Sequence, residues 1–418
     1  MDRFLVYGGR TLEGRIRTAG SKNAVLPIMA ASLLTNEEVV VHNVPNLRDV
    51  RTMSAVLRKL GVSVTFEAGT LRLRSEDESS WKAPYELVST MRASICVLGP
   101  LLAKRGRASV SMPGGCVLGV RPIDLHIKGL NALGADLIVE QGNVTARDAR
   151  LRGAEVFLGS AFGSTVLGTA NVMTAAVLAE GVTVIEHAAV EPEIEDLACF
   201  LQAMGAAIEG VGTHRIVIEG VKELHGCEYT VIPDRIEAST YLIAGALIGG
   251  TLEVEGAKAG HILALLDTLQ AAGVEVERDG ALLRVKGGGD IKPVDVTTHC
   301  YPGFPTDLQA QIMVLLALAN GISIITERIY PDRFIHVAEL NRLGATIRKE
   351  SNISIVHGVS RLSGAQVMAS DLRASAALVL AGLVAEGETE IHRVYHIDRG
   401  YERIDDKLNS VGACIERI

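Results

Sequence analysis

Residues 262–276 read ILALLDTLQAAGVEV, and this stretch shows the unit from which the chain is built. Apolar residues at positions 262, 265, 266 and 269 recur with the spacing of one face of a helix. Gly273 then ends the helix, and an alternating, strand-like segment begins at Val274. A second alternating segment, 282–285, follows the turn at 278–280, so the pattern predicts a helix that leads into a β-hairpin.

The same helix, glycine and strand recur six times along the chain. The glycines that end the helices are spaced by 68 to 73 residues: Gly61, Gly134, Gly205, Gly273, Gly344 and Gly412. Each repeat offers a small sheet backed by helices, which is too little structure to bury its own apolar face. We therefore expect an α/β (α+β) protein of six repeats of about 70 residues, arranged three plus three with the helices inside.

The ends of the chain predict which repeats belong together. The sixth repeat stops at Ile418, one strand short of its relatives, whereas two strand-like segments, 4–6 and 12–16, belong to no repeat. If these N-terminal strands complete the last repeat, one domain is discontinuous, at 1–20 and 231–418 (repeats 4–6). The other domain, 21–230 (repeats 1–3), is inserted into it. A chain that crosses twice between two lobes favours a hinge, and a cleft between the lobes is where we expect a site.

Composition excludes several classes of protein. Of the 418 residues, 48% are hydrophobic and 22% charged, which supports packed cores, and the net charge of −8 argues against a nucleic-acid partner. The first residues lack the pattern of a signal peptide and no apolar run reaches a membrane-spanning length, so we expect a cytoplasmic protein with no membrane partner. Six cysteines without a short paired spacing give no support to a disulfide framework or a metal site.

The segment 113–122 is a glycine-rich loop that carries a thiol and a guanidinium, Cys116 and Arg121. Glycines allow the backbone of such a loop to approach a ligand closely. A thiol is mostly protonated at neutral pH, and a nearby arginine favours the thiolate, so both acid and nucleophile chemistry stay open for Cys116. The structural alternative is a buried cysteine in a turn.

Other charged residues stand at the ends of predicted elements, where the lining of a cleft is recruited. Lys22 lies at the first predicted crossing and Asp307 at the start of an apolar helix. Asp371 with Arg373, and Asp398 with Arg399, lie close together in sequence at two further element ends. The plainer alternatives are a solvated lysine, an aspartate that stabilises a helix N-terminus, and surface ion pairs.

Taken together, these motifs resemble a known family. They are Lys22-Asn23, the Pro-Gly-Gly-Cys loop with Arg121-Pro122-Ile123-Asp124-Leu125-His126, Pro305-Thr306-Asp307, Asp371-Leu372-Arg373-Ala374 and the segment 395–403. The chain resembles the UDP-N-acetylglucosamine enolpyruvyl transferases essentially end to end. Its Arg-Pro-Ile motif also resembles 5-enolpyruvylshikimate-3-phosphate synthase, but the cysteine loop and segment 395–403 favour the nucleotide-sugar branch.

The resemblance implies a two-lobed inside-out α/β barrel and an addition–elimination reaction that needs no cofactor and no metal. The implied substrates are phosphoenolpyruvate and UDP-N-acetylglucosamine. Cys116 would be the general acid and Asp307 the base for the sugar hydroxyl, with Lys22 and Arg399 as catalytic cations. The substrate-binding residues that it implies are Asn23, Arg92, Arg121, Pro122, Ile123, Asp124, Leu125, His126, Thr165, Val166, Ile329, Tyr330, Asp371 and Arg373.

Two positions depart from the pattern of the family. Leu167 follows Thr165-Val166 where glycine is usual, and Asn46 stands where a basic residue is common. The alternative functions are therefore a paralogous transferase that acts on another uridine nucleotide and a relative that binds a nucleotide sugar without catalysis. A shikimate-pathway synthase is a third.

Overall fold

The computed structural model describes residues 2–112 and 123–418, and these residues form two compact units. Unit 1 comprises residues 2–19 and 233–418, and unit 2 comprises residues 20–112 and 123–232. Backbone hydrogen bonds mark the change of unit, because Asp234 N donates to Ala19 O in unit 1 at 2.8 Å and Ser21 N donates to Ile232 O in unit 2 at 2.7 Å.

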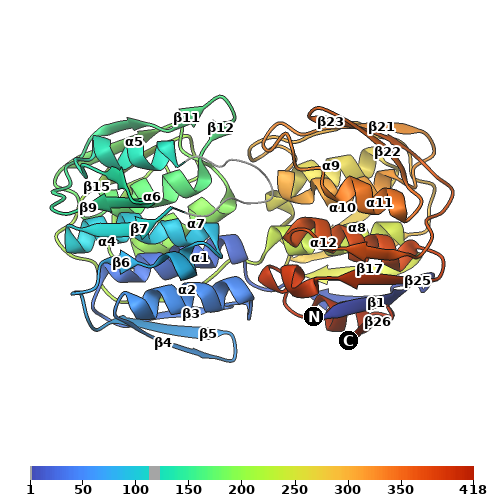
Figure 1. The fold of residues 1–418 in the computed structure, drawn as a ribbon, viewed down its shortest axis with the longest axis horizontal. Helices are drawn as coiled ribbons and strands as arrows, with labels where there is room; N and C mark the ends of the chain where they lie inside the picture. The colour runs from blue at the N-terminus through green and yellow to red at the C-terminus, as the bar shows by residue number, and fades with distance from the viewer. Residues whose placement is uncertain (1, 113–122) are drawn as a thin grey trace. The chain divides into compact units, whose positions relative to one another are not determined.

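Three four-stranded sheets form the strand part of unit 1 (Figure 1). In order of neighbouring strands they are β18 (Val276–Asp279), β19 (Leu282–Gly287), β17 (Gly250–Glu255) and β2 (Gly14–Arg17); β20 (Val296–Thr297), β21 (Ile322–Thr326), β23 (Ile353–His357) and β22 (Thr346–Glu350); and β24 (Gln366–Met368), β25 (Glu388–His392), β1 (Arg3–Tyr7) and β26 (Ile415–Arg417).

Three four-stranded sheets also form unit 2, together with the short pair β11 (Gly159–Ser160) and β12 (Gly163–Ser164). The four-stranded sheets are β16 (Glu228–Thr230), β3 (Val39–His42), β5 (Thr70–Ser75) and β4 (Val62–Glu67); β6 (Lys82–Ala83), β7 (Ala108–Ser111), β9 (Asn143–Ala146) and β8 (Ile138–Glu140); and β10 (Glu155–Phe157), β13 (Val182–Glu186), β15 (Arg215–Glu219) and β14 (Ala207–Glu209).

All six four-stranded sheets have one pairing pattern, which confirms the predicted repeats. An edge strand pairs in parallel with its neighbour, as β20 does with β21, and the two remaining pairs are antiparallel, as in β21–β23 and β23–β22. The register is set by alternation, because every second residue of β21 and β23 is buried. Each sheet therefore has one face on a core, as the alternating segments predicted.

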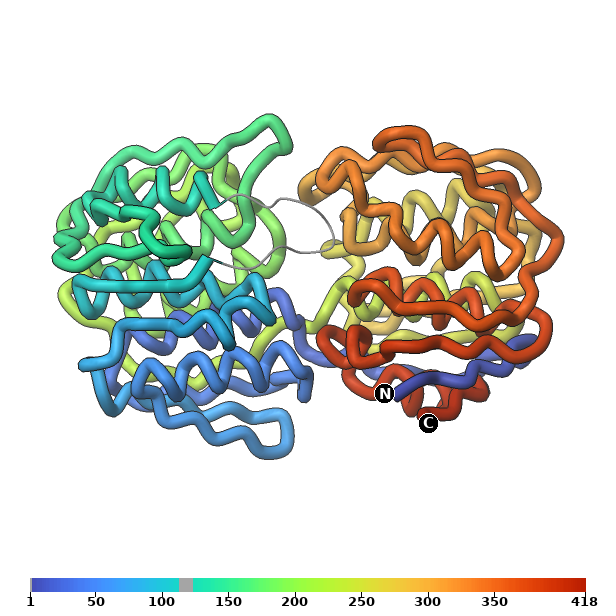
Figure 2. Tube along the Cα trace, in the orientation of Figure 1, coloured from blue at the N-terminus to red at the C-terminus, as the bar shows by residue number. Residues whose placement is uncertain are grey.

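The N-terminal strand β1 completes the sixth repeat, as expected from the missing last strand. It pairs with both β25 and β26, and the two ends of the chain lie side by side where Arg3 and Ile418 exchange backbone hydrogen bonds at 2.9 and 3.0 Å (Figure 2). The second N-terminal segment was wrongly assigned to that repeat. It forms β2, which pairs in parallel with β17 and so supplies the edge strand of the fourth repeat.

The first helix of each repeat is buried, as predicted for helices that lie inside. Unit 1 packs α8 (Arg235–Leu247), α10 (Gln309–Leu316) and α12 (Leu372–Val384) against one another, and unit 2 contains α1 (Lys22–Ala31), α4 (Leu98–Arg105) and α6 (Val166–Ala176). Every residue of α12 from Leu372 to Leu383 is buried, because alanine, leucine and valine cover all sides of this helix. The ends of these helices reach the edge of each core, and several candidate site residues lie there.

The second helix of each repeat is amphipathic and ends at one of the six glycines. These helices are α2 (Arg48–Lys59), α5 (Asp124–Ala132), α7 (Pro192–Ala203), α9 (Leu263–Ala271), α11 (His336–Arg342) and α13 (Ile404–Asn409). The six glycines have φ between 82° and 110°, a backbone conformation that favours glycine, so the chain turns sharply into the hairpin that follows.

The remaining described helices are short. They are α3 (Tyr85–Val88) and the 3-10 turns η1 (Ser32–Leu34), η2 (Arg92–Val97), η3 (Ala259–His261), η4 (Thr306–Leu308) and η5 (Val394–Arg399).

Candidate functional site

Asp307 lies in unit 1 on η4, directly before the buried helix α10. Arg333 Nη1 donates to Asp307 Oδ1 at 2.8 Å, and Arg373 Nη2 donates to Asp307 Oδ2 at 3.0 Å. The side chains of Arg333 and Arg373 are 7% and 3% exposed, whereas that of Asp307 is 26% exposed. The carboxylate is thus the accessible member of a group whose two cations are buried.

The two arginines control the protonation of Asp307. Burial alone would raise the pKa of this carboxyl, but the charges and hydrogen bonds of Arg373 and Arg333 outweigh burial and hold the pKa well below its ordinary range. Asp307 is therefore ionised at neutral pH, and it is a weak base as long as both arginines remain bound to it. A substrate anion that takes over one arginine would raise the basicity of the carboxylate.

Arg333 is the functional candidate that the sequence analysis missed. It follows Asp332 in a polar turn after β21, where an adjacent acid and base are typical of a solvated surface pair. Asp332 does pair outward with Lys349, whereas Arg333 points into the protein. In the sequence, Arg333 could have been noticed only because it follows a strand, since the other charged candidates also lie at the ends of predicted elements.

The loop after β21 also carries the predicted residues Ile329 and Tyr330. Their backbone N–H groups donate to Glu327 Oε1 at 2.8 and 3.0 Å, and the guanidinium carbon of Arg333 lies 5.8 Å from the ring centre of Tyr330. Both side chains are half-buried. The structure therefore brings Ile329, Tyr330, Asp307 and Arg373 of the predicted set into one connected group in unit 1.

Asp371 and Arg399 occupy other element ends of unit 1. Asp371 caps α12, since its Oδ1 accepts from the N–H groups of Arg373 at 2.9 Å and Ala374 at 3.1 Å. Arg399 is half-buried at the end of η5. Its neighbour Asp398 forms an ion pair with Arg417, whose Nη2 and Nη1 donate to the two carboxylate oxygens at 2.6 and 3.0 Å. For Asp398 the plainer alternative, a structural ion pair, therefore holds.

In unit 2, Lys22 is the first residue of α1 and Asn23 follows it half-buried. Lys22 Nζ lies 2.9 Å from Asp49 Oδ2 at the start of α2, with side chains that are 12% and 3% exposed. A largely buried ion pair places the ammonium group firmly. Lys22 is accordingly held in position, unlike the solvated lysine of the alternative interpretation.

Arg92 and His126 lie near each other at the starts of η2 and α5. His126 is 2% exposed, and its Nδ1 lies 2.8 Å from Asn171 Nδ2 on α6. Burial, together with the smaller effect of the charge of Arg92, lowers the pKa of His126 to about 3. The imidazole is therefore neutral, and a direct contact of His126 with substrate remains a prediction.

The other predicted residues of unit 2 also stand at helix starts. Ile123 is buried just before α5, Asp124 is exposed and Leu125 is half-buried. Thr165 caps α6, since its Oγ1 accepts from Gly168 N at 3.2 Å, and Val166 is the first residue of that helix. Helix starts carry partial positive charge and free N–H groups, which suits an anionic ligand.

Three predicted residues lie outside the described part of the chain: Cys116, Arg121 and Pro122. Their roles remain predictions.

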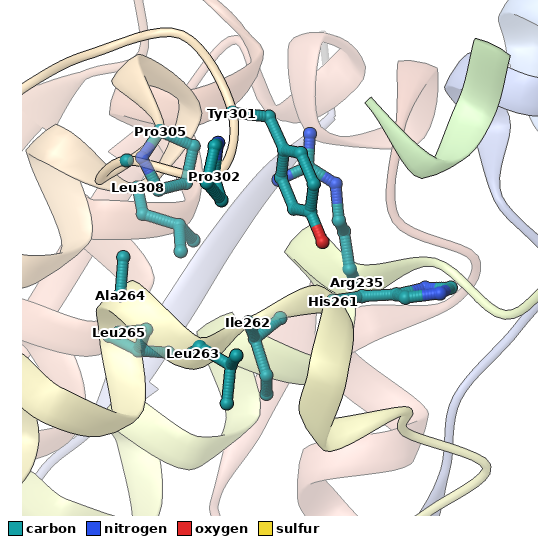
Figure 3. A pocket seen from close by; sticks show the side chains of 11 residues that line it. Arg235, His261, Ile262, Leu263, Ala264, Leu265, Tyr301, Pro302, Pro305 and Leu308 are labelled. Carbon is teal, nitrogen blue, oxygen red and sulfur yellow. The ribbon is translucent and has the colours of Figure 1, made fainter. Parts of the chain in front are cut away.

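A small hollow in unit 1 adjoins η4 on the side of Pro305 and Leu308 (Figure 3). Its polar lining comes from Arg235, whose guanidinium carbon lies 5.4 Å from the ring centre of Tyr301, and from His261. Its remaining lining residues are mostly apolar. The hollow is therefore a neighbour of Asp307 and contributes one further cation, Arg235, to this end of unit 1.

Within residues 2–112 and 123–418, no group of three or more histidine, cysteine, aspartate or glutamate side chains is arranged to hold a metal ion. No helix in the same residues is long and apolar enough to cross a membrane.

Comparison with known proteins shows the family to which the chain belongs. The family model of EPSP synthase (3-phosphoshikimate 1-carboxyvinyltransferase) matches residues 6–408, so the chain belongs to this family of carboxyvinyl transferases. Within it, the chain is similar to curated enzymes named UDP-N-acetylglucosamine 1-carboxyvinyltransferase. The one from Methylacidiphilum infernorum (isolate V4) is 56% identical over 418 residues, with 100% of this chain and 99% of the relative covered. The one from Anaeromyxobacter sp. (strain K) is 55% identical over 423 residues, with 100% of both covered.

Solved structures show the same fold. The enolpyruvyl transferase NikO from Streptomyces tendae matches with a TM-score of 0.89 at 24% identity, covering 100% of this chain and 98% of that one. EPSP synthase from Acinetobacter baumannii matches with a TM-score of 0.76 at 18% identity, covering 100% of both chains. The predicted inside-out α/β fold class is therefore confirmed.

Proposed function

We propose that this chain transfers the enolpyruvyl group of phosphoenolpyruvate to the 3-hydroxyl of UDP-N-acetylglucosamine and releases phosphate. The relatives that are named for this acceptor match the chain over its full length at more than half identity. The single structural observation that supports the proposal is the placement of Asp307 between Arg333 and Arg373. This group offers an ionised base next to two cations that suit carboxylate and phosphate.

The reaction consists of addition and then elimination. The Cys116 thiol gives a proton to C3 of phosphoenolpyruvate while the sugar oxygen bonds to C2, and Asp307 takes the hydroxyl proton. In the elimination a C3 proton passes to the Cys116 thiolate, which restores the thiol. The electrons of that C–H bond form the C2–C3 double bond, and the C2–O bond to phosphate breaks with its electron pair on phosphate. The thiol is also able to add to C2 as a covalent nucleophile.

Cationic side chains neutralise the negative charge of phosphoenolpyruvate during these steps. Arg373 and Arg333 are buried, and Lys22 is held by Asp49, so each is positioned before the substrate arrives. Arg399, Arg121 and Arg92 complete the proposed set. When a substrate anion draws one arginine away from Asp307, the pKa of the carboxyl rises toward a value that suits a general base. Substrate binding itself thereby activates the base.

Residues that we propose to bind the acceptor lie at the helix starts of unit 2 and, in unit 1, mainly on the loop after β21. In unit 2 they are Asn23, Ile123, Asp124, Leu125, His126, Thr165 and Val166, with Pro122 next to Ile123 in the sequence. In unit 1 they are Ile329, Tyr330 and Asp371. The two units are proposed to be the two domains of the protein. Residues 20–232, expressed alone, should unfold cooperatively in denaturant; a non-cooperative transition would contradict the domain assignment.

The biological setting follows from the product. The reaction is proposed to serve peptidoglycan precursor synthesis in the cytoplasm, and thus cell wall biogenesis, cell shape and cell division. Cys116 would be the target of fosfomycin-type epoxides. No cofactor, metal, nucleic acid or membrane is needed for the proposed chemistry.

Phosphate release is the direct test. Purified protein with phosphoenolpyruvate should release phosphate in the presence of UDP-N-acetylglucosamine and not with shikimate 3-phosphate, and Cys116→Ser should abolish most of the release. Turnover of shikimate 3-phosphate that Cys116→Ser leaves intact would favour the synthase. An intact fold that releases no phosphate with either acceptor would favour a binding protein, and turnover of another uridine nucleotide alone would favour the paralogue.

A further inference from the structure

We propose that Glu327, a buried carboxylate outside the set of candidate site residues, is a positioning residue for the reaction. This role rests on the proposed function: Glu327 positions Asp307 through Thr306 and Arg333. The same carboxylate also positions the backbone of residues 329 and 330.

Glu327 follows β21 and is 0% exposed. A buried carboxylate is costly unless its oxygens accept hydrogen bonds, and those of Glu327 do. Oε1 accepts from Thr298 Oγ1 at 2.6 Å and from the N–H groups of Ile329 at 2.8 Å and Tyr330 at 3.0 Å. Oε2 accepts from Thr306 Oγ1 at 2.9 Å. One side chain thus joins the strand end, the loop after it and η4.

A directed chain of hydrogen bonds leads from Glu327 to Asp307. Thr306 Oγ1 accepts from Arg333 Nη1 at 3.0 Å, and the same nitrogen donates to Asp307 Oδ1 at 2.8 Å. Because a guanidinium only donates, the single hydroxyl proton of Thr306 is left for Glu327. The carboxylate therefore fixes the orientation of the hydroxyl, and the hydroxyl fixes the nitrogen that holds the base.

A second branch starts from the same carboxylate. The N–H groups of Ile329 and Tyr330 turn the loop around Glu327 Oε1, and this turn sets the Tyr330 ring 5.8 Å from the guanidinium carbon of Arg333. The strand side is tied as well, since Glu327 N donates to Asn352 O at 2.8 Å. Loss of the carboxylate would therefore loosen both the proposed acceptor loop and the arginine that holds the base.

Thr298 provides a matched control, because it also donates its hydroxyl to Glu327 but lies outside the chain that leads to Asp307. Its Oγ1 accepts from Arg328 N at 2.9 Å, and the residue is 0% exposed. Thr298→Val and Thr306→Val each remove one hydroxyl from the same carboxylate at nearly constant volume. A purely structural role of Glu327 predicts that the two variants behave alike.

The experiment compares Thr306→Val, Thr306→Ser, Thr298→Val and Glu327→Gln in the full-length enzyme, with kcat, both KM values and the unfolding temperature measured for each. Positional control of a base is worth about tenfold to a hundredfold in rate. Thr306→Val should lower kcat by about that factor, Thr306→Ser should restore it, and Thr298→Val should retain kcat within about twofold of wild type. Glu327→Gln should lower kcat and also raise the KM for UDP-N-acetylglucosamine, because it disturbs both branches.

The pH profile adds a readout that a structural role would not move. Thr306→Val should weaken the hydrogen bond from Arg333 to Asp307. The apparent pKa of the acidic limb of the kcat/KM profile should therefore be higher in Thr306→Val than in Thr298→Val. An active wild type in which Thr306→Val matches Thr298→Val in kcat and pH profile would overturn the role of Glu327. A folded wild type without phosphate release would instead overturn the proposed function. If Glu327→Gln fails to fold, the threonine pair decides.

Discussion

Asp307 and Arg373 are joined by a hydrogen-bonded ion pair of 3.0 Å although 66 positions separate them in sequence. Asp307 precedes the buried helix of the fifth repeat and Arg373 lies at the start of that of the sixth, so the packing of α10 on α12 brings the pair together. Arg333 closes the other side of the carboxylate. The starts of the buried helices of two successive repeats thus supply the carboxylate and one of its two cations.

Replacement of Asp307 by asparagine should separate binding from chemistry. Asparagine keeps an oxygen for one arginine but cannot take the hydroxyl proton, so we expect kcat to fall by a factor of about 100 or more. The KM for phosphoenolpyruvate should change much less. Steady-state kinetics of Asp307→Asn beside Asp332→Asn, an exposed aspartate on the neighbouring loop, would measure this. A kcat for Asp307→Asn within a few-fold of the control would exclude Asp307 as the base.

Cys116 should be the site at which an epoxide inactivates the enzyme. Intact-protein mass spectrometry after treatment with fosfomycin should show one added inhibitor on the wild type and none on Cys116→Ser. Cys199→Ser serves as the control, because Cys199 is an exposed cysteine of unit 2. An adduct that persists in Cys116→Ser and disappears in Cys199→Ser would contradict the assignment.

His126 should make the protein less stable as the pH falls. Burial, followed by the charge of Arg92, lowers the pKa of this group to about 3, whereas in the unfolded chain it is near 6.5. The unfolded state then binds a proton first, so the contribution to stability is complete above about pH 6.5 and is lost progressively toward pH 3. Between pH 6.5 and pH 5 the loss should be about 2 kcal/mol.

Denaturant unfolding of His126→Gln and of His357→Gln, an exposed histidine on β23, at pH 8 and pH 5 would isolate this effect. The free energy of unfolding should depend less on pH in His126→Gln than in wild type, while His357→Gln should keep the wild-type dependence. Equal pH dependence in all three proteins would show that His126 is not the group responsible.

Gly344 is one of the six glycines that end the second helix of each repeat, and its replacement tests whether glycine is required there. Its φ of 92° is unfavourable for any residue with a side chain, so Gly344→Ala should lower the free energy of unfolding by about 1–2 kcal/mol. A Cβ at Gly289 would meet no atom within 4 Å, and the φ of Gly289 lies outside the unfavourable positive range. Gly289→Ala should therefore be close to neutral. Similar stabilities for the two alanine variants would argue against a conformational requirement at Gly344.

Much of the fold follows from local patterns in the sequence. The glycines mark helix ends because their left-handed backbone is a local requirement, and the missing last strand predicted where β1 pairs. The edge strand β2 was misplaced because its partner, β17, is more than two hundred residues away. Alternation predicts a strand and its buried face, but not the sheet that it joins.

The candidate site was only partly predictable for the same reason. Lys22, Asp307 and Arg373 were found because they lie at element ends within motifs of a resembling family. Arg333 and Glu327 depend on contacts across the fifth repeat, and nothing in their neighbours distinguishes them from solvated charges. A polar side chain reveals its role only when its burial and partners are known.

Enolpyruvyl transfer is tested most directly by the mass of the product that the full-length protein forms from phosphoenolpyruvate and UDP-N-acetylglucosamine. We expect a nucleotide sugar that is heavier by one carboxyvinyl group, formed in equal amount to the phosphate released and absent with Cys116→Ser. Unchanged UDP-N-acetylglucosamine after incubation with a folded, wild-type protein would contradict it.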